Sequence, residues 1–113
     1  MARLRCRVVA EAGSGPTTPG ADRVLQDRGV FLIPDILCSA GGVSVSYFEW
    51  AQDRQGFFWD ELEVGKQLEK FMRRAFHEVY ETAKRSKLDM RTSAYVLAVS
   101  RVAEATRARG LFP

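Results

Sequence analysis

Apolar and polar positions divide the chain into two short extended segments followed by a long helical part. The run RCRVVAEA, residues 5–12, is short and contains adjacent β-branched residues, which is typical of a strand. The run VFLIPDI, residues 30–36, is apolar at consecutive positions, as expected of a parallel strand that is buried on both faces. The turn sequence GSGP, residues 13–16, ends the first of these strands.

Residues 17–29 lie between the two strands and predict a helix. Thr17 or Thr18 supplies the N-cap, Pro19 suits the first turn, and Gly29 ends the helix. A strand, a helix and a strand in this order predict a βαβ unit with a right-handed crossover. Both strands then end at the same edge of the sheet, where open α/β sheets bind their ligands. The sequences GSGP and LCSAGG both fall at that edge.

After Ala40 the pattern becomes helical. Apolar residues recur at intervals of three and four over residues 64–83, which predicts an amphipathic helix. Asp60 is placed to cap this helix, and Glu63, three positions later, is placed to reach back and complete a capping box.

A further helix is predicted from Asp89 to a stop at Gly110. Its apolar side comprises Met90, Ala94, Leu97, Ala98, Val102 and Ala105. The short link SKLD before it predicts a helical hairpin. The expected fold class is therefore α/β: a partial doubly wound (Rossmann-like) domain with one βαβ unit, followed by a helical C-terminal part with a long helical hairpin. Two parallel strands make a poor sheet alone, so we expect them to belong to a larger one.

Composition narrows the class of protein. A chain of 113 residues with 46% hydrophobic residues has room for one globular domain or part of one. No stretch approaches the ~20 apolar residues of a membrane span, and the start of the chain does not resemble a signal peptide, which favours the cytoplasm. The net charge of +3 comes from interleaved charges that form no basic stripe, so neither a nucleic acid nor a membrane is an expected partner.

Cysteine and histidine are too sparse for a metal site. Cys6 and Cys38 have no CxxC spacing, and His77 is the single histidine. We therefore expect two reduced, buried thiols and a surface or partly packed histidine, with no disulfide framework and no zinc site.

Six aromatic residues lie within a segment of thirteen residues: Tyr47, Phe48, Trp50, Phe57, Phe58 and Trp59. They are expected to be core or interface residues. In so short a chain they also predict an exposed apolar patch, and such patches usually mark contact with another protein surface.

Three motifs carry a resemblance to a known family. The sequences VVAEAGSGPTTPGAD, VFLIPDILCSAGGVSVSYFEWAQDRQGFFW and DMRTSAYVLAVSRVAEATRARG together resemble the carboxy-terminal part of glutamate dehydrogenase, in the glutamate/leucine/phenylalanine/valine dehydrogenase family. The resemblance covers roughly residues 6–110. It implies that residues 1–50 are the end of a nucleotide-binding domain, including the start of the helix that follows it, and that residues 51–113 are C-terminal helices.

The resemblance also implies site residues. Ser14 and Ser39 correspond to two asparagines that lie beside the nicotinamide riboside of NAD or NADP, and Val43 and Ser46 correspond to residues that contact glutamate. Serine keeps a hydroxyl at the two cofactor positions but lacks the paired donor and acceptor of an amide. Gly20 stands where the family usually has glutamate, which places a poor helix former in the first turn.

The residues themselves leave structural alternatives open. The Ser46 hydroxyl can be satisfied by the backbone of its own helix, and Ser14 and Ser39 suit a turn and an N-cap. Gly41 and Gly42 either form a flexible segment at the start of a helix or allow a close approach of the backbone to a ligand or another domain.

The family's catalytic lysine and aspartate and its GxGxxG loop have no counterpart among these residues, so no catalytic residue is assigned. We expect a truncated relative of an NAD(P)-dependent glutamate dehydrogenase that does not interconvert L-glutamate and 2-oxoglutarate on its own. The alternative is an interaction or regulatory module that docks on a full-length dehydrogenase or forms a homo-oligomer.

Overall fold

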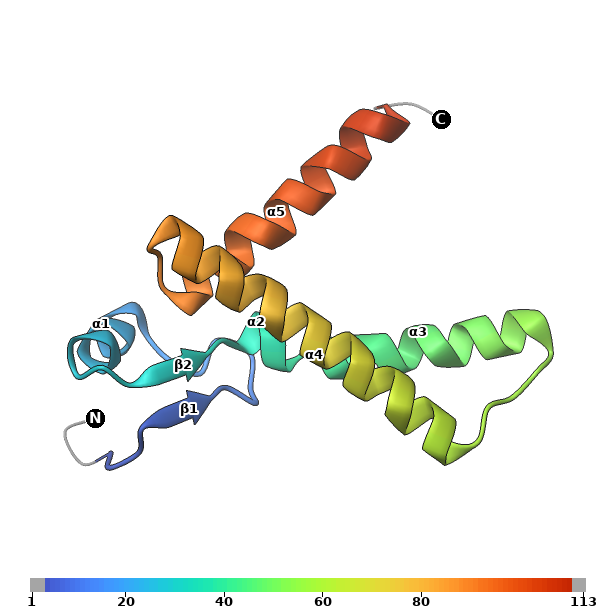
Figure 1. The fold of residues 1–113 in the computed structure, drawn as a ribbon, viewed down its shortest axis with the longest axis horizontal. Coiled ribbons are helices and arrows are strands. Elements are labelled where there is room, and N and C mark those ends of the chain that lie inside the picture. The colour runs from blue at the N-terminus through green and yellow to red at the C-terminus, as the bar shows by residue number, and fades with distance from the viewer. Residues whose placement is uncertain (1–3, 111–113) are drawn as a thin grey trace.

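The computed structural model describes residues 4–110 of the chain (Figure 1). Two short strands and a helix between them lie at one end of the molecule, and the longer helices extend away from them. In chain order the elements are β1 Val8–Ala10, α1 Pro19–Asp27, β2 Phe31–Ile33, α2 Asp35–Cys38, α3 Ala40–Gln55, α4 Glu61–Ser86 and α5 Met90–Arg109. None of the helices within residues 4–110 has both the length and the hydropathy of a bilayer-spanning segment.

The predicted βαβ unit is present. Strands β1 and β2 are parallel, Val8 lies opposite Phe31, and α1 connects the strands. Both strands are shorter than the sequence pattern predicts. Pro34 ends β2 because proline has no N–H to donate to the ladder, and α2 begins at the next residue. Within residues 4–110 the sheet has these two strands, which fits a partial α/β domain.

Side-chain caps begin three of the helices, at Thr18 and Asp60 as the sequence predicts and also at Asp89. The Thr18 hydroxyl accepts from Ala21 N, and the carboxylates of Asp60 and Asp89 accept from the backbone N–H three residues later. Such a cap is typically worth about 1 kcal/mol. The structure shows half of the predicted capping box at α4, because the Glu63 carboxylate accepts from Gln67 Nε2 at 2.8 Å.

The hydrophobic core lies where α2, α4 and α5 meet. Its buried members are Leu37, Val79, Met90 and Ala94. Strand β2 joins this core through Phe31, whose ring centroid lies 6.3 Å from Phe76 and 6.2 Å from Tyr80. Aromatic pairs of this kind add about 0.5–1.5 kcal/mol each beyond the area that they bury. The predicted apolar stripe of α4 therefore joins the sheet to the helices.

Helix α3 packs on α4 through one face. Phe48 is 3% exposed, and its ring centroid lies 5.3 Å from Phe71 and 5.7 Å from Trp59. Gln52, also buried, donates from Nε2 to Phe48 O and accepts from Trp59 N at 2.6 Å, which fixes the link between the two helices. The predicted exposed apolar patch is also present, because Tyr47, Trp50, Phe57 and Phe58 are exposed.

Helix α5 follows α4 through a tight turn, as the SKLD link predicts. Lys87 adopts the left-handed conformation there, with φ of 55°. The two helices pack around Met90 and Ala94, and α5 then diverges from α4 toward its C-terminal end (Figure 1). Val102 and Ala105, at the far end of the predicted apolar side, are exposed, because this diverging part has no neighbouring element within residues 4–110 to cover them.

The prediction of two buried thiols is also wrong. Cys6 is exposed, because it precedes β1 and lies outside the core, and Cys38 is half-buried at the end of α2. The Cys38 Sγ lies 3.6 Å from Ile33 O as a weak donor. Both cysteines are free, and His77 is exposed on α4 as expected.

Candidate functional site

The loops at the carboxyl ends of β1 and β2 meet, as the βαβ topology predicts. Gly15 N donates to Asp35 Oδ2 at 2.8 Å, which joins the loop after β1 to the first residue of α2. Gly15 has a φ of +60°, a conformation that residues with a side chain rarely adopt. The GSGP loop therefore has a defined conformation at the edge where ligands of α/β sheets bind.

The two predicted cofactor residues lie near this edge with accessible hydroxyls. Ser14 is exposed in the loop beside Gly15. Ser39 is exposed at the junction of α2 and α3, where it occupies the N-cap position of α3 in an αR conformation. Its side chain makes no capping hydrogen bond, so the alternative of a capping serine is not realised at Ser39.

The two predicted substrate residues lie on the outward face of α3. Val43 is 71% exposed, and Ser46 is exposed one turn further along. Ser39, Val43 and Ser46 share one side of the helix because they are spaced four and three residues apart. It is Ser44, on the inward side, whose hydroxyl donates to a backbone carbonyl of its own helix, Ala40 O, at 2.8 Å.

The two glycines at the start of α3 differ in their surroundings. A Cβ at Gly41 would meet Met72 Sδ at 3.7 Å, which is an ordinary packing distance against α4. A Cβ at Gly42 would meet nothing within 4 Å. Gly41 therefore belongs to the contact between α3 and α4, whereas Gly42 leaves open space at the candidate site.

Three carboxylates from separate parts of the chain converge on Arg91, and one of them, Asp35, also contacts the GSGP loop. Arg91 Nη2 lies 2.7 Å from Glu11 Oε1, Nε lies 2.8 Å from Asp22 Oδ2, and Nη1 lies 3.4 Å from Asp35 Oδ1. Glu11 directly follows β1, Asp22 lies in α1 and Asp35 begins α2, so the guanidinium in the first turn of α5 links the segment after β1 to α1 and α2. We call these four residues the Arg91 cluster.

The surroundings of Glu11 and Arg91 favour the charged forms of these two residues. The hydrogen bond from Arg91 is the largest influence on Glu11 and lowers the pKa of that carboxyl, although burial works in the opposite direction. The bond to Glu11, followed by the contacts with Asp22, raises the pKa of the Arg91 guanidinium above its ordinary value. Hydrogen bonds to charged groups are among the stronger ones, so the cluster holds α5 firmly against the βαβ unit.

Sequence reasoning did not single out the Arg91 cluster. The DMRT motif that contains Arg91 is conspicuous, but its acidic partners are distant in the sequence: 80 residues away for Glu11, 69 for Asp22 and 56 for Asp35. One signal was available. Acidic residues at the ends of two predicted strands require a cation nearby if they are buried together.

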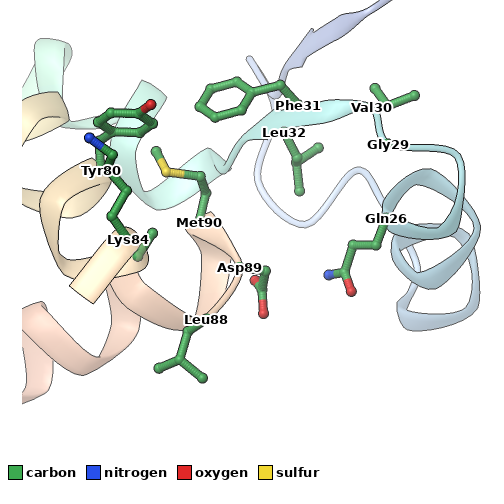
Figure 2. Close-up of a pocket in the computed structure, with 11 residues that line it drawn as sticks. Gln26, Gly29, Val30, Phe31, Leu32, Tyr80, Lys84, Leu88, Asp89 and Met90 are labelled. Carbon is green, nitrogen blue, oxygen red and sulfur yellow. The ribbon is translucent and has the colours of Figure 1, made fainter. Parts of the chain in front are cut away.

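A separate hollow of about 470 Å³ opens at the other end of the strands. Figure 2 shows the side chains that line it from β2, α4 and the start of α5. Its walls are mostly apolar, Asp89 caps α5, and Lys84 Nζ lies 4.9 Å from the centroid of the Tyr80 ring. The hollow is therefore distinct from the candidate site.

The candidate site has the exposed hydroxyls of Ser14, Ser39 and Ser46 and an open helix face, which suit binding of a polar ligand. Within residues 4–110 the structure gathers no group of three side chains that could hold a metal ion. The exposed His77 lies on α4, outside the loops that form the site.

A parallel strand pair with polar loops at its carboxyl edge, continued by packed helices, is a unit of α/β proteins. The chain belongs to the Glutamate/Leucine/Phenylalanine/Valine dehydrogenase family, because the model of that family matches residues 1–110. It is 52% identical over 111 residues to the glutamate dehydrogenase of Thermotoga maritima, and 50% identical over 107 residues to the NAD-specific glutamate dehydrogenase of Staphylococcus aureus strain COL.

Solved structures agree with this assignment. The crystal structure of glutamate dehydrogenase from Peptoniphilus asaccharolyticus matches with a TM-score of 0.91 at 39% identity, over 98% of this chain and 28% of that one. The hetero-hexameric glutamate dehydrogenase from Thermus thermophilus in its Leu-bound form also gives 0.91, at 37% identity, over 97% of this chain and 26% of that one. The two curated relatives are matched over 98% and 95% of this chain but only 27% and 26% of their own lengths. The chain thus spans about a quarter of the length of the relatives that it matches.

Proposed function

We propose that this chain forms the last part of the nucleotide-binding domain of an NAD(P)-dependent glutamate dehydrogenase, together with the helices that follow that domain. In this proposal, residues 1–50 complete the nucleotide-binding domain and residues 51–113 are the helices that follow it. The family's reaction is the reversible oxidative deamination of L-glutamate to 2-oxoglutarate and ammonia, which takes place in the cytoplasm in our proposal. The observation that carries the proposal is the meeting of the GSGP loop with the start of α2 through Gly15 and Asp35.

The residues present fit one part of the cofactor. The exposed hydroxyls of Ser14 and Ser39 can each donate and accept a hydrogen bond, which suits the polar riboside next to a nicotinamide ring. When bound, the nicotinamide would supply the hydride acceptor. The chain has no GxGxxG loop to hold the pyrophosphate, so these two serines orient one end of the cofactor and leave the other end to residues outside this sequence.

In the same proposal Val43 and Ser46 form one wall of the substrate pocket. The Ser46 hydroxyl contacts the distal carboxylate of glutamate, and Val43 excludes water beside the aliphatic part of the substrate. The lysine and the aspartate that perform the proton transfers in the family are not supplied by this chain. We therefore expect the 113 residues alone to show no turnover of glutamate with NAD or NADP.

Restoring the family's amides tests the cofactor assignment. Ser14→Asn and Ser39→Asn should strengthen binding of NADH, measured by titration calorimetry or by NMR shift changes confined to the two loops. Ser100→Asn is the matched control, because Ser100 is exposed on α5, far along the chain from these loops. Equal NADH binding in all variants, or turnover of glutamate by the unmodified chain, contradicts the proposal.

The exposed aromatic patch favours a second candidate function. Tyr47 and Trp50 on α3 and Phe57 and Phe58 after it are all more than half exposed, which is unusual for such large apolar side chains. In this alternative the chain docks through the patch on a full-length dehydrogenase or on a second copy of itself. Light scattering with and without a full-length homologue tests it, and a monomeric chain that binds no homologue excludes it.

A further inference from the structure

Asp35 connects the two loops to the terminal helix. Its Oδ2 accepts from Gly15 N at 2.8 Å, and its Oδ1 faces Arg91 Nη1 at 3.4 Å. Its backbone N–H donates to Glu11 Oε2 at 2.9 Å, while the other oxygen of Glu11 accepts from Arg91 at 2.7 Å. The conformation of the GSGP loop and the placement of α5 therefore depend on the same two carboxylates.

We infer that Arg91 is a positioning residue that couples α5 to the GSGP loop through Glu11 and Asp35. The two carboxylates lie close together, and each repels the other unless a cation lies between them. The guanidinium supplies that cation and a rigid fork of donors, and it orients Asp35 together with Ile36 N, which donates to Asp35 Oδ1 at 2.8 Å. Asp35 can then present Oδ2 to Gly15 in a fixed direction.

The buried neighbours of Arg91 on α5 explain why this coupling extends to that helix. Met90 and Ala94, on either side of Arg91 in the sequence, are buried in the core against α4. A shift of α5 relative to α4 therefore moves the guanidinium, and the carboxylates must follow or lose their hydrogen bonds. The GSGP loop is the part that changes conformation most easily, because its residues are mostly exposed and one hydrogen bond joins Gly15 to Asp35.

The coupling itself requires no ligand. Its importance for the cofactor rests on the proposed function, which places Ser14 of the same loop beside the nicotinamide riboside. The experiment below is carried out without nucleotide, so its failure would not refute the proposed function, and failure of NADH to bind would not refute the coupling.

Amide hydrogen exchange of the 113-residue chain, measured by NMR, tests the inference with three variants. In Arg91→Met we expect exchange of the Gly15 amide to accelerate at least tenfold more than that of Val79 in the core, because the local hydrogen bond is lost. Arg91→Lys should give an intermediate value, since an ammonium keeps the charge but lacks the fork. Arg101→Met removes another α5 arginine, which pairs with Glu78 on the surface, and should leave Gly15 unchanged.

Two outcomes would overturn the inference. One is a folded Arg91→Met variant whose Gly15 exchange matches that of the unmodified chain. The other is a uniform acceleration of all protected amides, which would indicate a loss of global stability without specific positioning.

A titration of the unmodified chain covers the case in which Arg91→Met does not fold. The ionisable groups that face Arg91 are Glu11, Asp22 and Asp35 from the packed elements. As pH falls and the Glu11 carboxylate takes up its proton, the Gly15 amide resonance and the Arg91 Nε resonance should shift with one common midpoint. Separate midpoints would show that the loop and α5 respond independently, which contradicts the coupling.

Discussion

Arg91 Nη2 lies 2.7 Å from Glu11 Oε1, although the two residues are 80 positions apart in the chain. The contact joins the end of the first strand to the first turn of the last helix. Because the Glu11 side chain is 1% exposed, removing the Arg91 charge would leave a buried carboxylate without its cation, whereas Arg91 keeps Asp22 and Asp35 when Glu11 is changed. This ion pair therefore links the segment after the first strand to the last helix.

The first prediction concerns the charge of Glu11. Glu11→Gln removes the charge and keeps one of the two oxygens that accept from Arg91 and Asp35 N, so the new amide NH₂ must face one of these two donors. Breaking a buried ion pair costs about 3–5 kcal/mol, and we expect urea denaturation to show a loss toward the lower end of that range. Glu69→Gln is the control, since Glu69 pairs with Arg73 on the surface and should change stability by less than about 1 kcal/mol. Equal effects of the two variants would contradict the prediction.

The second prediction concerns pH. The pKa of Glu11 is lowered in the folded chain from an ordinary value of 4.5, chiefly by its bond from Arg91. A lowered pKa means that the folded state binds this proton less readily than the unfolded state, so the contribution to stability is complete above pH 4.5 and disappears as pH falls through the lower folded value. Urea midpoints measured from pH 7 down to pH 3 should fall in this window. The fall should be shallower in Glu11→Gln, and parallel profiles would count against the assignment.

The third prediction concerns Ser93, which is 0% exposed on α5. Its Oγ has no hydrogen-bond partner among residues 4–110, so folding removes a hydroxyl from water without compensation. Ser93→Ala should therefore leave stability unchanged or raise it by up to about 1 kcal/mol. Thr82→Ala is the comparison: that buried hydroxyl donates to Glu78 O, and its loss should not be stabilising. A clear loss of stability in Ser93→Ala would reveal a partner that the structure does not show.

The fourth prediction concerns the contact between α3 and α4. Phe48 is 3% exposed between Phe71 and Trp59, and Phe48→Ala should cost about 3–5 kcal/mol by leaving a cavity. Tyr47→Ala, one residue away and 58% exposed, should cost less than about 1 kcal/mol. Thermal unfolding of the two variants measures the difference. Similar unfolding temperatures would show that α3 is not held to α4 through Phe48.

Local chemistry explains what the sequence could predict. Thr18, Asp60 and Asp89 cap helices through bonds that span three residues, so a short window of sequence contains both partners. The βαβ unit follows from the order of its segments and from the turn at Gly29, which has positive φ. The family assignment was also predictable, because the motifs that carry it are contiguous.

The errors arise where distant contacts or missing neighbours decide the outcome. The Arg91 cluster unites residues from four elements, and no local pattern shows that they meet. Val102 has an apolar position in the helical repeat, but nothing within residues 4–110 covers it. The assigned roles of Ser14, Ser39, Val43 and Ser46 remain predictions: the structure places them beside an open surface, and their contacts depend on what faces that surface.

The two sides of α3 are subject to different physical requirements. The side with Phe48 and Gln52 is committed to packing, so changes there are limited by volume and by hydrogen-bond geometry. The side with Ser39, Val43 and Ser46 contributes almost nothing to the interior of this unit. Substitutions at these three positions can therefore change the shape and polarity of the exposed side of the helix while the scaffold beneath stays intact.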